Sequence, residues 1–137
     1  NISILATDID KQIIAKAKEG IYNQFEVQRG LPIPLLLKYF TQLPENRWQL
    51  KEGVRGRVAF KHHNLLGNAR HHGMFDVVFC RYVLIYFDDA TKNLVLQHIA
   101  EVMPKGGYLF LGSAETLPVG TSVFAPHEQE RSLYVRQ

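Results

Sequence analysis

The sequence predicts an α/β fold with a mainly parallel sheet and an antiparallel edge. Continuous apolar runs at residues 2–7, 77–80 and 108–112 are typical of strands buried on both faces of a parallel sheet. The first two are followed by helical patterns, which indicates strand–helix units. Residues 20–61 interrupt this rhythm, and alternating apolar residues there indicate a small inserted antiparallel β-subdomain.

Length and composition indicate one globular domain. The 137 residues are 46% hydrophobic and 21% charged, and no apolar run approaches the roughly 18–20 residues of a membrane span. The N-terminus shows no secretory signal, and the single cysteine, Cys80, allows no internal disulfide. We therefore expect a cytoplasmic protein without membrane insertion, and the net charge of +3 is too mild to require an anionic partner.

The first unit is a strand at residues 2–7 that ends at Asp8, followed by a helix. Asp10 is the expected N-cap of this helix, which runs to about Glu19 and stops at Gly20. Asp8 has two interpretations of equal weight. It is a turn residue, or it binds the ribose hydroxyls of a nucleotide, as acidic residues at this place do in nucleotide-binding α/β folds.

The insertion contains a short helix and two strands. Pro32 and Pro34 lie in the expected first turn of the helix, which Pro44 closes. Strands at 47–51 and 55–62 are expected to form an antiparallel hairpin. Its outward residues are basic: Lys51, Arg55, Arg57 and Lys61. This face is either simply solvated or a docking surface, and nucleic acid is not expected because the patch is small and lacks stacking aromatics.

Polar residues after the second of these strands invite a binding role. Asn64, next to Leu65, can hydrogen-bond an adenine edge, although asparagine after a strand is also a common turn residue. No metal is expected, since adjacent histidines at 62–63 and 71–72 point apart on a strand and no further ligand completes a site.

Residues 75–89 hold the strongest indication of a functional site. The apolar run at 77–80 ends on Arg81, at the carboxyl end of the strand, where ligands bind in open α/β sheets. Tyr86 follows in apolar surroundings, and Asp88 can cap the next helix. Cys80 is expected to fill the core. The alternative for Arg81 is a salt bridge to Glu115.

The rest of the chain continues the α/β pattern. Residues 90–103 form an expected helix with a core-facing stripe: Leu94, Val95, Ile99, Val102 and Met103. A strand at 108–112 places residues 113–115 at the ligand edge, and Phe124 with residues 133–135 indicates a closing hairpin.

Several motifs occur in the order of a known family. They are residues 6–10, 20–22, 38–40, Phe60 with 64–66, 75–81, 83–88 and 106–115, and the most distinctive is Cys-Arg-x-Val-Leu-Ile-Tyr-Phe at 80–87. From about Ile4 to Tyr134 the chain resembles the catalytic domain of the CheR-family chemotaxis receptor methyltransferases. The resemblance implies a Rossmann-like S-adenosylmethionine-dependent methyltransferase sheet and methylation of glutamates on chemoreceptor cytoplasmic domains, with S-adenosylhomocysteine as product.

The resemblance also implies roles for individual residues. Asp8 corresponds to the carboxylate that binds the ribose, and Asn64 and Leu65 to the pair that lines the adenine. Cys80 and Arg81 correspond to the strand-end residues that face cofactor and substrate, with Tyr86 beside the transferred methyl group. Residues 20–61 resemble the β-subdomain that docks on receptors.

Two departures from the family pattern are visible. Tyr82 stands where the family usually has asparagine. The family also has an N-terminal helical domain and a first strand with a Gly-rich acidic loop, and neither is present in residues 1–137. We therefore expect a partial catalytic domain with a strand absent between those of residues 2–7 and 76–80, inactive by itself.

Methyl transfer to glutamate suits these residues because the carboxylate is already ionised at pH 7 and no general base is needed. Arg81 can hold the substrate carboxylate bidentately. Two rival functions remain: an enzyme methylating a small molecule from the same cofactor, and a non-enzymatic binding module for receptor or cofactor.

Overall fold

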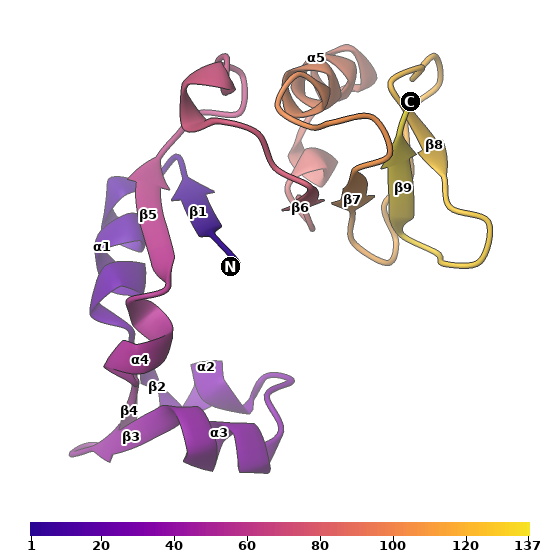
Figure 1. Ribbon diagram of the computed structural model, residues 1–137. Helices are drawn as coiled ribbons and strands as arrows, with labels where there is room; N and C mark the ends of the chain where they lie inside the picture. Colours follow the sequence, from indigo (N-terminus) through magenta and orange to yellow (C-terminus); the bar gives the residue numbers. More distant parts are fainter. The chain divides into compact units, whose positions relative to one another are not determined.

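The computed structural model describes all 137 residues, and they divide into two compact units, Asn1–Asn64 and Leu65–Gln137. Figure 1 shows the elements of both, with unit 1 in indigo to magenta and unit 2 in the later colours. No helix combines the length and the hydrophobicity that crossing a bilayer requires.

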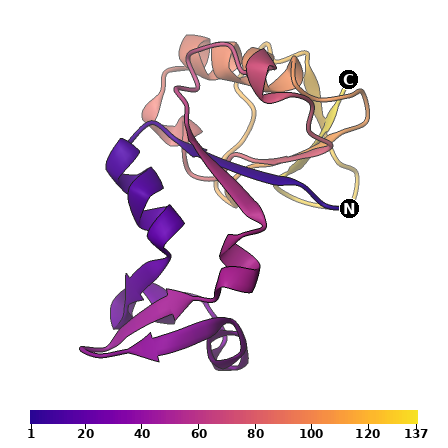
Figure 2. The same ribbon diagram turned by 60° about the vertical axis from the view of Figure 1, so that its left-hand side comes forward.

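Unit 1 is built on a parallel pair of strands. β1 (Ile4–Asp8) pairs with β5 (Val58–His62) in the register Ile4 to Val58 through Asp8 to His62. Figure 2 shows the two strands side by side. Because the pairing is parallel, the carboxyl ends of β1 and β5 meet at the same edge.

Helix α1 (Lys11–Glu19) begins and ends as the sequence predicts. The Asp10 side chain accepts a hydrogen bond from the backbone N–H of Gln12 at 2.7 Å, the expected N-cap. Gly20 adopts φ +69° and donates its N–H to the Lys16 carbonyl at 2.9 Å. A left-handed residue at this place ends the helix, and glycine adopts that conformation at little cost.

The inserted subdomain is antiparallel, but not in the predicted way. Its sheet has the order β2-β4-β3. The strands are β2 (Ile21–Asn23), β3 (Phe40–Leu43) and β4 (Arg47–Leu50), with the helices α2 (Gln24–Gln28), α3 (Ile33–Tyr39) and α4 (Glu52–Arg55). Val27, Leu36 and Trp48 form its buried core.

The predicted hairpin of strands 47–51 and 55–62 is wrong. Residues 52–55 form helix α4 in place of a turn, and β5 pairs with β1 in the parallel sheet. The true hairpin partner of β4 is β3, in residues that the sequence analysis gave to the preceding helix. That helix ends at Tyr39, and residues 44–46 make the turn, with Glu45 and Asn46 at positive φ.

Unit 2 holds a four-stranded sheet in the order β6-β7-β9-β8 (Figure 1). The strands are β6 (Val77–Phe79), β7 (Tyr108–Phe110), β8 (Phe124–Pro126) and β9 (Leu133–Arg136). β6 and β7 are parallel, whereas β8 and β9 form the predicted antiparallel closing hairpin. The short 3-10 helices η1 (Arg70–His72) and η2 (Leu84–Tyr86) and the helix α5 (Asp89–Ala100) complete the unit.

Helix α5 provides much of the core of unit 2. Asp88 caps it, as predicted, by accepting the Thr91 N–H at 2.8 Å. Val95, Leu96 and Ile99 are buried against β7 residue Leu109. Leu94, which the sequence analysis placed in the core stripe, is 47% exposed, and Leu96 occupies the buried position. The helix ends at Ala100, so Val102 and Met103 are buried from the following turn.

The sheet of unit 2 is covered on one face only, contrary to the expectation of strands buried on both faces. Val78 and Leu109 face the core, but Phe79 is 69% exposed. Val77 and Tyr108 lie on the same face of the sheet as Phe79, and they are exposed too. The Phe79 and Phe110 rings stack there, with centroids 4.8 Å apart.

Within their own sheets, β1 pairs only with β5 and β6 pairs only with β7. Each therefore has one edge without a neighbouring strand.

Candidate functional site

The carboxyl ends of β6 and β7 lie next to each other because the two strands are parallel. β6 leads directly into Cys80, Arg81 and Tyr82, and β7 leads into Leu111, Gly112 and Ser113. Both segments are predicted from the sequence to lie at a ligand edge, and the parallel pairing of β6 and β7 brings them together.

Cys80 lies at the base of this edge and is only 5% exposed. Its backbone N–H donates to the Phe110 carbonyl at 2.9 Å, which continues the β6–β7 ladder by one residue. Burial, together with the nearby Glu115 carboxylate, raises the pKa of the thiol to about 11. The side chain is therefore a neutral thiol at pH 7 that packs in the core, as predicted, and not a nucleophile.

Glu115 ties the two strand ends together. One carboxylate oxygen, Oε2, accepts hydrogen bonds from the backbone N–H groups of Tyr82 and Gly112, each at 2.6 Å. The residue is 7% exposed, and its other oxygen, Oε1, is buried without a hydrogen-bond partner. Two short bonds to a carboxylate are charge-assisted, so they fix the backbone after both strands.

Gly112 is required by this arrangement. A Cβ atom at this position would lie 2.6 Å from Glu115 Oε2 and 2.6 Å from Tyr82 Cε1. The Tyr82 ring and the Glu115 carboxylate thus occupy the space on the side-chain face of residue 112. A glycine directly after a strand is the sequence feature that could have indicated this close approach.

Tyr82 adopts a left-handed backbone conformation, with φ +59°. Its hydroxyl lies 2.9 Å from the Ser113 hydroxyl and accepts the Ser113 N–H at 3.4 Å. The hydrogen bonds with Ser113, and then the nearby Arg81 guanidinium, lower the pKa of this phenol. Left-handed backbone is uncommon for a side chain of this size, whereas asparagine adopts it more readily.

Arg81 is exposed and lies against Tyr82, with its Cζ atom 5.3 Å from the centre of the ring. This distance is typical of a cation–π contact. The alternative of a salt bridge to Glu115 is wrong, because the carboxylate oxygen that is engaged binds backbone N–H groups. The guanidinium is exposed to solvent.

Tyr86 ends the 3-10 helix η2 and is 81% exposed. The apolar surroundings predicted for this phenol are not found in unit 2, where the side chain is exposed. The helix is anchored by Leu84, which is 2% exposed, so its neighbours at 85 and 86 point outward.

In unit 1, Asp8 and Asn64 lie at the carboxyl ends of the β1–β5 pair. Asp8 is half-buried, and its Oδ1 accepts the Asp10 N–H at 2.8 Å while its carbonyl accepts the His63 N–H at 2.9 Å. The first contact is the turn role that the sequence analysis considered. Asn64 is exposed and follows β5 by two residues. In unit 2, Leu65 is half-buried against the core.

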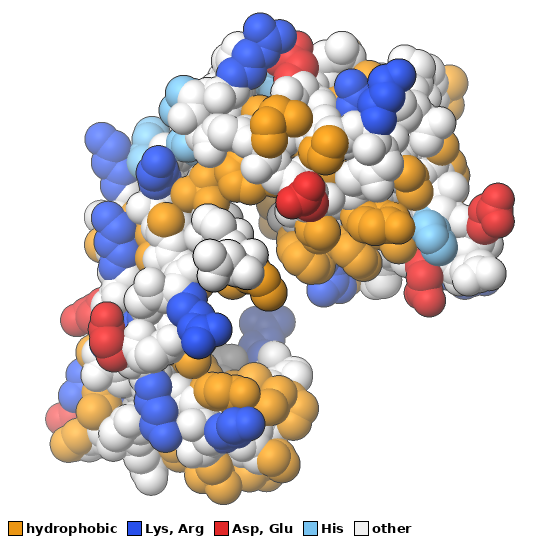
Figure 3. All heavy atoms as spheres, in the orientation of Figure 1, with side chains coloured by type: hydrophobic (Ala, Val, Ile, Leu, Met, Phe, Trp, Pro, Cys, Tyr) orange, Lys and Arg blue, Asp and Glu red, His pale blue; other side chains and the backbone are white.

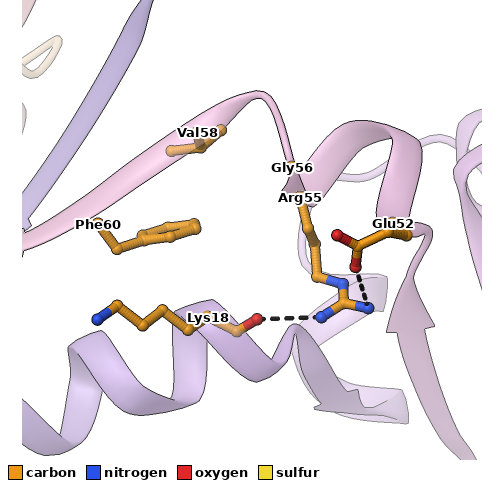
Figure 4. A pocket seen from close by; sticks show the side chains of 6 residues that line it. All are labelled: Lys18, Glu52, Arg55, Gly56, Val58 and Phe60. Atoms are coloured by element: carbon orange, nitrogen blue, oxygen red, sulfur yellow. Dashed lines mark hydrogen bonds and ion pairs between the residues drawn. The ribbon is translucent and has the colours of Figure 1, made fainter.

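A hollow of about 210 Å³ lies in unit 1, and none of the predicted site residues lines it. Figure 4 shows the residues that do: Lys18, Glu52, Arg55, Gly56, Val58 and Phe60. Arg55 is fully engaged there. It donates to the Leu50 carbonyl at 2.8 Å and the Lys18 carbonyl at 3.1 Å, and it pairs with Glu52 at 2.9 Å.

Arg55 therefore joins α4 to the end of α1, and it is not one of the outward basic residues that the sequence predicts. The subdomain instead exposes hydrophobic side chains, visible as an orange area in the lower part of Figure 3. Phe25 is 82% exposed, Ile33 70% and Leu37 63%.

Known proteins with similar sequences agree on one family. The family model described as "CheR methyltransferase, SAM binding domain" matches residues 1–133. "Chemotaxis protein methyltransferase Cher2" of Pseudomonas putida is 41% identical over 114 residues, which are 83% of this chain and 42% of that protein. "Chemotaxis protein methyltransferase 1" of Pseudomonas aeruginosa is 41% identical over 116 residues, covering 85% and 42%.

The fold also agrees with a solved methyltransferase. Magnesium protoporphyrin IX methyltransferase from Synechocystis, solved with bound SAM, superposes with a TM-score of 0.52 and 16% identity, covering 100% of this chain and 61% of that one. At this identity the likeness shows the fold alone, which is that of Rossmann-like S-adenosylmethionine-dependent methyltransferases. The chain spans less than half the length of the curated relatives that it matches.

The match to residues 1–133, the identities of 41% and the methyltransferase fold lead to one conclusion. This chain belongs to the CheR methyltransferase family and corresponds to its SAM-binding domain.

Proposed function

We propose that the protein with this chain methylates glutamate side chains on the cytoplasmic domains of chemoreceptors, using S-adenosylmethionine as the methyl donor. The observation that carries the proposal is Arg81, an exposed guanidinium held directly after β6 beside Tyr82. It offers a permanent cation to a carboxylate substrate in a chain of this family.

The residues suit the cofactor. Asp8 presents a half-buried carboxylate at the carboxyl end of β1, and its orientation is fixed by the Asp10 N–H. A carboxylate so placed can accept the two ribose hydroxyls. Asn64 offers an amide for the adenine edge and Leu65 an apolar surface, and Cys80 backs the strand end. When bound, S-adenosylmethionine supplies an electrophilic methyl group on a sulfonium.

Arg81 and Tyr86 act on the substrate in this proposal. A glutamate carboxylate, with a reference pKa of about 4.3, is already ionised at pH 7, so no general base is needed. Arg81 holds and orients that carboxylate through a bidentate pair. Tyr86, whose hydroxyl reaches solvent from η2, donates a hydrogen bond or presses on the reacting groups.

The inserted subdomain is proposed to dock on the receptor, and the full-length protein is proposed to carry an N-terminal helical domain and to work in the cytoplasm. The subdomain has its own core of Val27, Leu36 and Trp48, so it is a defined element within unit 1. A small-molecule substrate would not need such a docking element.

The test uses the full-length protein with radiolabelled S-adenosylmethionine and purified receptor cytoplasmic fragments. We expect base-labile methyl esters on receptor glutamates, located by mass spectrometry. Capture of the receptor fragment without any ester would instead support a non-enzymatic binding module. Labelling that ignores receptor fragments and appears on a small molecule would support the other rival.

A further inference from the structure

Glu115 is a buried acidic residue that the proposed reaction does not use directly. It is 7% exposed, and it follows β7, whereas Arg81 follows β6. Burying a carboxylate is costly unless it is well hydrogen-bonded, so its presence here requires a reason. Its Oε2 binds two backbone N–H groups, and its Oε1 is buried without a partner.

The two N–H groups belong to the residues that fix the site. Tyr82 is the residue directly after Arg81, and Gly112 lies two residues after β7. The bond to Tyr82 holds that residue in a left-handed conformation, φ +59°, which costs free energy for a side chain of this size. Without the carboxylate, the backbone at 82 is free to relax.

The conformation of Tyr82 determines where Arg81 lies. The guanidinium sits over the Tyr82 ring at 5.3 Å, and the ring in turn is held by the Ser113 hydroxyl at 2.9 Å. Ser113 follows Gly112, the second residue that Glu115 binds. The Glu115 carboxylate thus fixes the backbone at Tyr82 and the backbone at Gly112, next to the residue that holds the Tyr82 hydroxyl.

We propose that Glu115 is a positioning residue for methyl transfer: it holds the chain after β6 against the chain after β7 and thereby sets the orientation of Arg81. Glu115 acts through Arg81 and does not contact the substrate. The effect on turnover rests on the proposed function, but the placement of the Arg81 side chain can be tested without it.

The decisive experiment is a double-mutant cycle in the full-length protein, with Glu115→Ala, Arg81→Ala, the pair, and Glu130→Ala as a control at an exposed acidic residue of the same unit. Receptor-dependent kcat/KM, the Kd for S-adenosylmethionine and the thermal midpoint are measured for each. We expect Glu115→Ala to lower kcat/KM by on the order of 10²-fold in the Arg81 background and hardly at all in the Arg81→Ala background.

If the double variant loses kcat/KM by the product of the two single losses, the proposal is overturned, because Glu115 would then act independently of Arg81. If Glu115→Ala does not fold, Glu115→Gln replaces it. An amide oxygen can still accept both N–H groups but without the charge, so we expect a smaller loss with the same dependence on Arg81. An equal loss in both backgrounds would again refute the idea.

The readout that needs no turnover is the NMR spectrum of the Arg81 side chain. Its protons lie near the Tyr82 ring and should be shifted upfield in the wild type and in Glu130→Ala. In Glu115→Ala the shift should be lost. A shift that persists in a folded Glu115→Ala protein would refute the placement role, whether or not the protein methylates receptors.

Discussion

Substituting Gly112 by alanine tests the close packing at the strand ends directly. The added Cβ would lie 2.6 Å from both Glu115 Oε2 and Tyr82 Cε1, whereas ordinary contact begins at 3.4 Å. Both neighbours must therefore shift relative to residue 112 by about 0.8 Å, the difference between these two distances. Glu115 cannot yield without stretching its hydrogen bonds to Tyr82 and Gly112, both 2.6 Å.

The expected cost is that of overpacking a buried site, about 1–3 kcal/mol in the free energy of unfolding. At about 2–4 °C per kcal/mol for a protein of 150–250 residues, this corresponds to a fall in Tm of roughly 2–12 °C. Because the displaced groups hold Arg81, receptor-dependent kcat/KM should fall as well, while binding of S-adenosylmethionine should change less.

The assay is thermal unfolding followed by circular dichroism, combined with methyl-transfer kinetics of the full-length protein. The matched control is Gly53→Ala in helix α4, where an added Cβ meets nothing within 4 Å and φ is not positive. We expect that control to be neutral or slightly stabilising, because alanine favours helix over glycine. A Gly112→Ala protein as stable and as active as Gly53→Ala would refute the reasoning.

Three further predictions follow. Arg81→Ala should lower the rate of methyl transfer by on the order of 10²–10³-fold without loss of folding. Arg81→Lys should be nearly as slow, because an ammonium group cannot form the bidentate pair of a guanidinium. Wild-type turnover in either variant would remove Arg81 from the mechanism. Cys80→Ala should make stability less sensitive to alkaline pH than in the wild type, as measured by urea unfolding between pH 8 and 11. Asp10→Ala should cost about 1 kcal/mol through loss of the α1 N-cap, whereas Glu130→Ala, an exposed loop position, should cost almost nothing in the same assay.

The sign of the Cys80 effect follows from proton linkage. Burial and Glu115 raise the pKa of the thiol from 9.0 to about 11 in the folded protein, so the unfolded chain loses this proton first as the pH rises. Stability from this group is present below about pH 9 and is lost as the pH approaches 11, by on the order of 2 kcal/mol. The pKa of Tyr134 is also raised by burial and by Glu115, and it contributes in the same direction in both proteins, so the difference between them isolates Cys80.

Local signals were read correctly from the sequence where a residue acts on its own neighbours. Asp10 and Asp88 cap helices because their side chains reach the N–H two or three residues on, and Gly20 ends α1 because its backbone adopts positive φ. These depend on few residues and survive in any tertiary context. The same holds for the strand that delivers Cys80 and Arg81 to an edge.

The errors arose where the partner of a segment is distant in the chain. Residues 58–62 alternate as an antiparallel strand would, yet they pair in parallel with β1, more than fifty residues earlier. The position of a strand in a sheet depends on which other strand it pairs with. The alternation of apolar residues within the strand does not identify that partner. Arg55 was assigned to a basic face for the same reason, since one of its partners, the Lys18 carbonyl, lies 37 residues earlier in the chain.

The sequence by itself determined the family, the strand–helix units and the candidate residues Asp8, Asn64, Leu65, Cys80, Arg81 and Tyr86, because these depend on motifs and short-range patterns. Only the tertiary structure decided that Glu115 binds the backbone at Tyr82 and Gly112, and that Arg81 lies over the Tyr82 ring. The physical reason is that a carboxylate selects hydrogen-bond donors by distance in space, and the donors at 82 and 112 come together only when β6 and β7 pair.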